Sequence, residues 1–423
     1  MITGCDKNVS NLVIPEKIDG KTVTMIGDLA FAYCPLVTSI VLPDTIKMIG
    51  LRAFDETAWY QAQPDGMVYL GKHLYDYKGE MPENTEINVK EGTVSISPRA
   101  FEFCPLAKVV LPDGLQYIGE GAFYSCQNLS DVTVPDSIVY IGNDAFLSTQ
   151  WDAHRAPEYI GKVLYRHTSG QNTTVKDGTL HISAGAFSGC SELVSVTIPD
   201  SVRYIDDFAF ASCKQLREVK GLSGVVGIGD SAFLNCIQLE QITLPDRLTQ
   251  IGNSAFEGCK TLTAITIPEN VVQIGEHAFY HCRNLKNISI PEKVTNIGSH
   301  AFGETAWYQA QPDGPVYINR VLNAYKGEMP QGTVVKVKEG TVGISDDVFL
   351  RFDHLFEVVL PDSLRFIGDS AFSSCDALKD VRIPAGVESI GAGAFGFCPN
   401  INRIDVDADN AFYCSDDGVL FTK

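Results

Sequence analysis

The chain has 423 residues, of which 45% are hydrophobic and 20% charged, enough apolar side chains for a substantial core. Asp and Glu number 52 against 33 Lys and Arg, and the resulting formal charge of −19 disfavours binding to nucleic acid and to anionic membrane surfaces. No apolar run approaches the ~18 residues of a membrane span, and the segment Met1 to Gly4 does not look like the start of a signal peptide.

A unit of about 23 residues recurs along the chain and is marked by an Ala-Phe pair, or once Val-Phe, often with cysteine three residues later. The phenylalanines of these fourteen copies are, in chain order, Phe31, Phe54, Phe101, Phe123, Phe146, Phe187, Phe210, Phe233, Phe256, Phe279, Phe302, Phe349, Phe372 and Phe395. One unit is too small to bury its own apolar side chains, so the units must stack. The sequence therefore predicts a repeat solenoid, continuous over residues 1–423 with about 14 repeats.

Each unit is expected to contain two extended pieces. In one clear copy, residues 193–198 follow the pattern Leu-x-x-Val-x-Ile, whose alternation indicates a short strand with one face inward. Pro199 has no N–H to donate to a strand ladder, so the strand ends there. A second piece, Val-x-x-Ile-Gly, leads into Ala-Phe-x-x-Cys, for which we expect one helical turn. Strands of neighbouring units should pair in parallel.

The two faces of the first strand are predicted to differ. Its inward ladder would contain Ile198, Leu244, Ile267 and Ile290, and its outward ladder Thr133, Thr197, Thr243, Thr266 and Ser289. Thr197, Thr243, Thr266 and Ser289 are candidate binding residues, because solenoids bind partners on extended concave faces. The alternative is that a hydroxyl ladder simply makes a stable sheet surface.

The twelve cysteines follow the repeat. Cys190, Cys213, Cys236, Cys259 and Cys282 are 23 residues apart, a regularity that belongs to a repeat and not to a set of disulfides. Parallel side chains on adjacent units would keep their Cβ atoms about 4.8 Å apart, wider than the ~3.8 Å of a disulfide. All twelve are therefore predicted to be free thiols packed as small hydrophobic groups.

Three inserts interrupt the repeat, near residues 57–97, 149–183 and 305–345. In each, threonine replaces the cysteine, and Trp59, Trp151 or Trp307 follows two residues later. The first and third are near copies at an offset of 248, with residues 56–66 identical to 304–314. Each insert is predicted to form a β-hairpin and to add one turn to the stack, with hairpin turns at residues 71–72, 161–162 and 319–320.

The aromatic residues of the inserts have two interpretations. Trp59, Tyr60, Trp151, Trp307 and Tyr308 would form platforms for sugar or protein ligands if their rings were exposed. Alternatively, each tryptophan packs its insert onto the edge of the solenoid, since large aromatic rings usually bury most of their area.

No catalytic or metal-binding constellation stands out in the sequence. His277 and His300 should lie on adjacent units, but no third ligand at suitable spacing completes a zinc site. Aspartates between residues 405 and 416 are spaced loosely like a calcium loop, yet Asn410 stands where that loop needs glycine. Phosphate loops, nucleophile elbows and HExxH motifs are absent. We expect no enzyme activity, no metal and no cofactor.

The recurring pattern Leu-x-x-Ile-x-Ile-Pro-x-x-Val-x-x-Ile-Gly-x-x-Ala-Phe-x-x-Cys resembles the BspA-like leucine-rich repeat family of bacterial surface proteins. The resemblance implies a right-handed leucine-rich-repeat superhelix with a parallel β-sheet on its concave face and short strands or helical turns opposite. It also implies export, display at the cell surface and adhesion. Residues 406–421 look like the start of a further, longer unit of this family, so we expect a piece of a larger protein with its signal and anchor elsewhere.

Two functions remain open from the sequence. The leading hypothesis is a non-enzymatic adhesion scaffold that recognises host or microbial proteins or glycans outside the cell, without nucleic-acid partners or membrane insertion. The alternative is a structural spacer that displays a separate functional domain.

Overall fold

The structure, a computed structural model, describes residues 1–4, 9–154, 156–167 and 170–423. The chain divides into two compact units. The N-terminal stack comprises Met1–Thr168, Lys176–Ala186 and Ile205–Asp207, and the C-terminal stack comprises Ser169–Val175, Phe187–Tyr204 and Phe208–Lys423. Each is a solenoid of short parallel strands with very little helix, which confirms the predicted fold class. That the two form one continuous solenoid stays a prediction.

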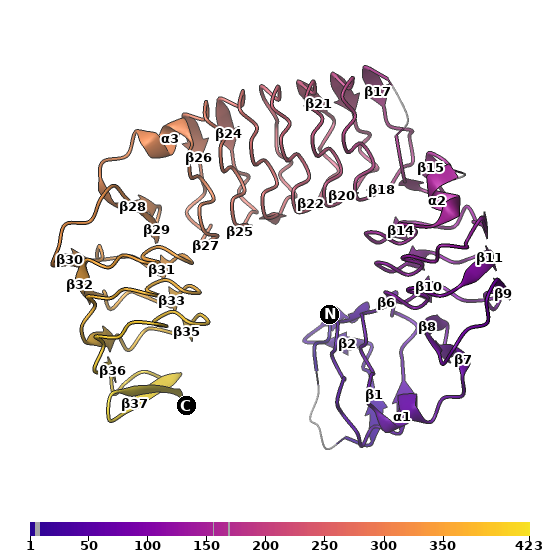
Figure 1. Cartoon of the computed structure of the whole chain (residues 1–423), viewed down its shortest axis with the longest axis horizontal. Helices are drawn as coiled ribbons and strands as arrows, with labels where there is room; N and C mark the ends of the chain where they lie inside the picture. Colours follow the sequence, from indigo (N-terminus) through magenta and orange to yellow (C-terminus); the bar gives the residue numbers. More distant parts are fainter. Residues whose placement is uncertain (5–8, 155, 168–169) are drawn as a thin grey trace. The chain divides into compact units, whose positions relative to one another are not determined.

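The strand that precedes the repeat's proline or its equivalent, here called the Ile-Pro strand, pairs in parallel with the same strand of adjacent repeats. In the N-terminal stack these strands are β1 (Asn11–Val13), β5 (Ser39–Val41), β9 (Thr85–Asn88), β11 (Leu106–Val110) and β13 (Asp131–Thr133). In the C-terminal stack they are β17 (Asn172–Thr174), β19 (Ser195–Thr197), β21 (Glu218–Lys220), β24 (Ala264–Thr266), β26 (Asn287–Ser289), β30 (Thr333–Lys336), β32 (Leu355–Val359), β34 (Val381–Ile383) and β36 (Ile404–Val406) (Figure 1).

The second extended piece, here called the Ile-Gly strand, forms its own parallel ladder. In the N-terminal stack these strands are β4 (Met25–Ile26), β6 (Met48–Ile49), β8 (His73–Lys78), β10 (Ser95–Ile96), β12 (Tyr117–Ile118), β14 (Tyr140–Ile141), β16 (Val163–Leu164) and β18 (His181–Ile182). In the C-terminal stack they are β22 (Gly227–Ile228), β23 (Gln250–Ile251), β25 (Gln273–Ile274), β27 (Asn296–Ile297), β29 (Val321–Lys326), β31 (Gly343–Ile344), β33 (Phe366–Ile367) and β35 (Ser389–Ile390), while β20 (Tyr204–Ile205) has one residue in each stack.

The glycine after the isoleucine of many Ile-Gly strands permits a close approach of adjacent repeats, although Ser97, Asp206 and Ser345 stand at the equivalent position in other repeats. At Gly298, an added Cβ would lie 2.4 Å from the backbone nitrogen of Glu276 in the preceding repeat. Backbone atoms cannot move away as a flexible side chain would, so this position excludes any side chain. The recurring Ile-Gly pair thus reflects how tightly the repeats stack.

The core of each stack is a column of phenylalanine rings from successive Ala-Phe pairs. Neighbouring rings lie 4.6–5.3 Å apart between centroids, with interplanar angles of at most 12°. Ile198, Leu244 and Ile267 are buried beside them, and Ile290 is partly buried. The predicted inward ladders are therefore confirmed.

The Ala-Phe-x-x-Cys segment forms a pair of turns instead of the expected helical turn. In one repeat Ser231 and Asn235 both have positive φ, 55° and 56°, which a right-handed helix does not allow. The N–H of Phe233 donates to the carbonyl oxygen of Ala255 in the next repeat at 2.8 Å. Such hydrogen bonds between repeats alternate with local ones, for example from the N–H of Cys236 to the carbonyl oxygen of Phe233 at 3.2 Å, so the segment is not a regular helical turn.

Most of the described cysteine thiols are buried, and seven of them donate hydrogen bonds to the preceding repeat. Cys213 Sγ lies 3.0 Å from the carbonyl oxygen of Phe187, and Cys236 Sγ lies 3.1 Å from that of Phe210. The eleven cysteines within the described residues are free, as predicted, and Cys5 lies outside them. The thiols thus act as donors as well as small apolar groups.

Each insert forms the predicted hairpin, and its second strand joins the Ile-Gly ladder. The antiparallel pairs are β7 (Gly66–Leu70) with β8, β15 (Tyr159–Ile160) with β16, and β28 (Gly314–Ile318) with β29. Further hairpins are β2 (Lys17–Ile18) with β3 (Lys21–Thr22) and β37 (Tyr413–Asp416) with β38 (Val419–Thr422).

The helices among the described residues are short: α1 (Ala58–Gln61), α2 (Gln150–His154) and α3 (Ala306–Gln309). No described helix combines the length and apolar character needed to cross a membrane.

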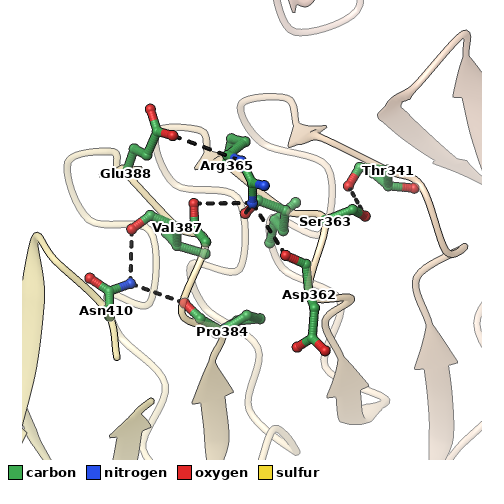
Figure 2. A network of polar contacts seen from close by, with 10 residues as sticks. Thr341, Asp362, Ser363, Arg365, Pro384, Val387, Glu388 and Asn410 are labelled. Carbon is green, nitrogen blue, oxygen red and sulfur yellow. Dashed lines mark hydrogen bonds and ion pairs between the residues drawn. The ribbon is translucent and has the colours of Figure 1, made fainter. Parts of the chain in front are cut away.

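Side chains tie together the turns that follow the Ile-Pro strands near the C-terminal end (Figure 2). Arg365 donates to the carbonyl oxygens of Asp362 and Gly386, at 3.2 and 3.4 Å, and so joins two repeats. The buried amide of Asn410 donates to the carbonyl oxygens of Pro384 and Val387, at 3.0 and 2.9 Å. Asn410 therefore fastens the final segment to the repeat before it.

Candidate binding surfaces

The outward side of the Ile-Pro strands carries the hydroxyl residues singled out from the sequence. Thr197 in β19, Thr266 in β24 and Ser289 in β26 are exposed. Thr266 and Ser289 are register partners, whereas Thr197 lies between Thr174 and Lys220. The hydroxyl rows are therefore short, and a charged side chain interrupts one of them.

The repeat that contains β21 departs from the pattern and leaves a hollow beside it. Gly221 stands where the preceding repeat has Ile198, and an added Cβ would lie 1.9 Å from the carbonyl oxygen of Ile198. The following repeat joins this ladder only by an isolated bridge between Glu218 and Gln241. Residues 218–223 and 241–247 line a cavity of about 650 Å³, and the candidate residue Thr243 lies on its wall.

The three tryptophans pack against the phenylalanine column. Trp59 lies 5.9 Å from Phe54, Trp151 lies 4.8 Å from Phe146 and Trp307 lies 6.0 Å from Phe302, measured between ring centroids. Trp151 is only 4% exposed, and Trp59 and Trp307 are partly buried. These contacts are those of rings that pack an insert onto its stack, and Trp151 presents no free ring face.

Threonine and lysine fix the short helix of an insert. Thr57 donates to the carbonyl oxygen of Phe54 at 2.7 Å, and its hydroxyl accepts from the N–H of Tyr60 as an N-cap. Lys78 donates to the carbonyl oxygens of Tyr60, Gln61 and Gln63 at the other end. An ammonium group at the carbonyl end of a helix is favourable, so this arrangement holds the aromatic residues in place.

The third insert repeats this scheme with the same residue types. Thr305 caps α3 through the N–H of Tyr308, and Lys326 donates to the carbonyl oxygens of Gln309 and Gln311. The duplicated sequence therefore builds the same local frame twice.

Tyr60 and Tyr308 occupy equivalent positions in different surroundings. The Tyr60 hydroxyl donates to the carboxylate of Asp76, and the residue equivalent to Asp76 in the third insert is Ala324. Tyr308 instead lines a cavity of about 460 Å³ that also has Asn323 and Ala324 in its wall. We did not single out Asn323 or Ala324 from the sequence, although the differences between the two copies at the 248-residue offset were a visible signal.

The histidine and aspartate clusters have structural surroundings. His277 and His300 stack with ring centroids 5.5 Å apart, which confirms that they lie on adjacent repeats. Asp405 accepts from Arg403, and Asp407 from Arg382. Within the described residues no group of three or more His, Cys, Asp or Glu side chains is arranged to hold a metal ion.

Comparison with known proteins gives one family. Residues 4–81, 62–166, 158–223, 180–309 and 329–416 match the model of the BspA type leucine rich repeat region. No curated protein matches the chain.

Several solved structures are similar to the chain. A leucine-rich cell surface protein from Faecalibacterium prausnitzii A2-165 is 25% identical, over 71% of this chain and 87% of that one, with a TM-score of 0.30. A leucine-rich repeat protein from Eubacterium ventriosum ATCC 27560 is 22% identical, over 83% and 95% of the two chains, with a TM-score of 0.35. The leucine-rich repeat protein of T. pallidum is 24% identical, over 51% and 82%, with a TM-score of 0.32.

Proposed function

The chain belongs to the family of BspA-type leucine-rich repeat proteins, and from that premise we propose that it is a non-enzymatic scaffold that binds host or microbial proteins or glycans at a bacterial cell surface. The proposal includes an extracellular location. It rests on a family built from stacked repeats, an architecture that presents extended surfaces to partners.

The observation that supports this function most directly is the exposure of hydroxyl side chains on several Ile-Pro strands. Thr197, Thr266 and Ser289 all point away from the buried ladder, at positions set by strand register. The cavity beside Thr243 gives this surface a concave region. Side chains held on a rigid sheet lose little conformational entropy on binding, and a partner therefore gains affinity from them.

Binding to arrayed, immobilised matrix proteins and glycans tests the proposal. We expect the wild-type protein to bind at least one of them. A variant with Thr197→Asp, Thr266→Asp and Ser289→Asp should bind that ligand about tenfold more weakly or worse. Each of the three side chains is expected to contribute a few tenths to one kcal/mol through its contact with the ligand, and the variant loses all three contacts.

A matched control places the same charge on the other ladder. Gln250, Gln273 and Asn296 are exposed and lie in adjacent Ile-Gly strands. Their replacement by Glu, Glu and Asp should leave binding within twofold of wild type. If the wild-type protein bound nothing on the array at high micromolar concentration, the binding function would fail and a structural spacer would be favoured.

A further inference from the structure

The first and third inserts are two copies of one hairpin, and three differences between them remove side-chain bulk from the third. Asp55 corresponds to Gly303, Tyr75 to Asn323 and Asp76 to Ala324. The first insert therefore shows how the space beside the hairpin is occupied when those three side chains are present.

Tyr75 fills the space in the first insert. Its side chain is buried, and its ring lies 5.8–5.9 Å from the rings of Phe54, Trp59 and Tyr60. The Tyr75 hydroxyl donates to Asp55 at 2.8 Å and accepts from the N–H of Phe54 at 2.9 Å. Together with the contact between Tyr60 and Asp76, these interactions leave the first insert filled and hydrogen-bonded.

In the third insert, the equivalent residues Asn323 and Ala324 line a cavity of about 460 Å³ together with Tyr308. Asn323 donates to Ser345 Oγ at 3.1 Å, so its short side chain is held at the strand and does not replace the tyrosine ring. A Cβ at Gly303 would lie 2.9 Å from the ring of Tyr280, so the glycine makes room for that ring in the wall. Among the described residues, the Tyr308 hydroxyl has no hydrogen bond that corresponds to the one between Tyr60 and Asp76.

The wall of this cavity is aromatic and acidic. Its aromatic residues are Tyr280, Tyr308, Tyr325 and Phe352, and its charged residues are Glu304, Asp346, Asp347 and Arg351. Three carboxylates therefore stand against one guanidinium. None of the three carboxylates forms an ion pair within the part of the chain that the structure describes.

Burial and neighbouring charges shift the pKa values of two groups in this wall, Asp346 and His300. Burial, and then the like charges of Asp369, Glu276 and Asp347, raise the pKa of Asp346, although the N–H of Asp369 donates to its carboxylate. Burial and the neighbouring His277 lower the pKa of His300, so this imidazole is neutral at pH 7 and contributes no compensating positive charge. An added cation would relieve the repulsion among these carboxylates.

The charges that line the cavity of the third insert were not copied with the hairpin. Where the third insert has His300 and Asp347, the first has Arg52 and Arg99. The two copies thus differ both in the space they leave and in the charge around it.

We propose that the cavity of the third insert binds an organic cation, an alkylammonium or guanidinium group, between its tyrosine rings and its carboxylates. Aromatic faces attract cations through their quadrupole, and carboxylates supply ion pairs. Anions would be repelled. A neutral saccharide would leave the excess of negative charge uncompensated in a partly apolar cavity. This site goes beyond the proposed surface function and does not depend on it.

Titration with small probes by calorimetry and ligand-observed NMR tests the site. The probes are N-acetyllysine amide, n-butylammonium, the neutral N-acetylnorleucine amide and N-acetylglucosamine. We expect one or both cations to bind with a Kd of about 1 mM or lower, and both neutral probes to bind at least about tenfold more weakly. Equal binding of both cations indicates a free amine as ligand, whereas preference for the lysine derivative indicates a lysine side chain of a polypeptide.

Variants connect binding to the cavity. Asn323→Tyr combined with Ala324→Asp rebuilds the filling of the first insert and should abolish cation binding, even though it adds a negative charge. Asp347→Asn keeps the space and should weaken binding about tenfold. Circular dichroism and thermal unfolding of each variant report whether the fold is retained.

The first insert provides the matched control. Tyr75→Asn combined with Asp76→Ala opens space there, but Arg99 stands where the third insert has Asp347, and Arg52 and Arg99 already form ion pairs with Asp55 and Glu102, so this variant should gain no second cation site. Equal affinity for the charged and neutral probes, or unchanged cation binding in the filled variant, would overturn the proposal. The filled variant should still bind the arrayed ligands, so failure of the cavity and failure of the surface function are separate results.

Discussion

Burial differs sharply between adjacent residues of one Ile-Pro strand and its continuation. Ile267 is 3% exposed and packs in the core, whereas Thr266 beside it is exposed. We expect Ile267→Ala to lower the free energy of unfolding by about 2–5 kcal/mol through lost burial and a new cavity. Thr266→Lys should change it by about 0.5 kcal/mol or less. Chemical denaturation measures both, and similar losses would show that the faces are wrongly assigned.

The buried thiols are expected to react slowly in the folded protein. Burial raises the pKa of Cys126 and of Cys213 to about 12. Since the thiolate is the reactive form, these cysteines should react with iodoacetamide at pH 8 roughly 1,000-fold more slowly than a free cysteine in the folded protein. After denaturation without reductant, mass spectrometry should find all twelve cysteines alkylated. Unlabelled pairs would indicate disulfides.

At the scale of elements, the first insert contains a carboxyl group, that of Asp76, whose charged form is destabilised by burial. Burial raises the pKa of Asp76 to about 6, above the ~3.9 of an exposed aspartate. The folded state therefore binds more protons than the unfolded state between about pH 4 and 6, and this residue lowers stability as the pH rises through that window. The hairpin carries this cost at neutral pH.

Asp76→Asn removes the charge and keeps an acceptor for Tyr60. We expect it to increase the free energy of unfolding at pH 7.5 by on the order of 1–3 kcal/mol, with a smaller effect at pH 4. Urea denaturation at both values measures the difference. Asp44→Asn is the control, because Asp44 is exposed and its pKa is lowered by Lys72, so that change should bring no gain. An equal gain at both values of pH would contradict the burial argument.

Hairpins and strands were predictable from sequence because each follows from short-range chemistry. The turn at residues 319–320 begins with Asn319, whose φ is 51°, a value that asparagine tolerates. The Ala-Phe-x-x-Cys turns were not predictable in detail, since about half of their N–H groups bond to the next repeat, whose position the local sequence does not specify. The cavity beside Tyr308 was missed because it arises from side chains that one copy lacks and the other has.

At the scale of the whole molecule, a strict repeat makes architecture easier to infer than in most folds. The position of Phe256 in the sequence also gives its neighbours, Phe233 and Phe279, at 5.2 and 5.3 Å. The 23-residue spacing thus carries three-dimensional information directly.

The free energy of unfolding of such a molecule should be a sum of contributions from single repeats and from contacts between neighbouring repeats. A substitution should therefore destabilise mainly the repeats next to it. Phe256 is fully buried between the rings of two adjacent repeats. We expect Phe256→Ala to cost about 3–5 kcal/mol and to raise amide hydrogen exchange most strongly between residues 233 and 279. Exchange around Phe123, which belongs to the N-terminal stack, should remain within about twofold of wild type, because the lost packing concerns only the repeats next to Phe256. Hydrogen exchange read by mass spectrometry measures both regions in one experiment. A uniform loss of protection across both stacks would instead mean that they unfold as a single cooperative unit, and the nearest-neighbour description would then fail for this chain.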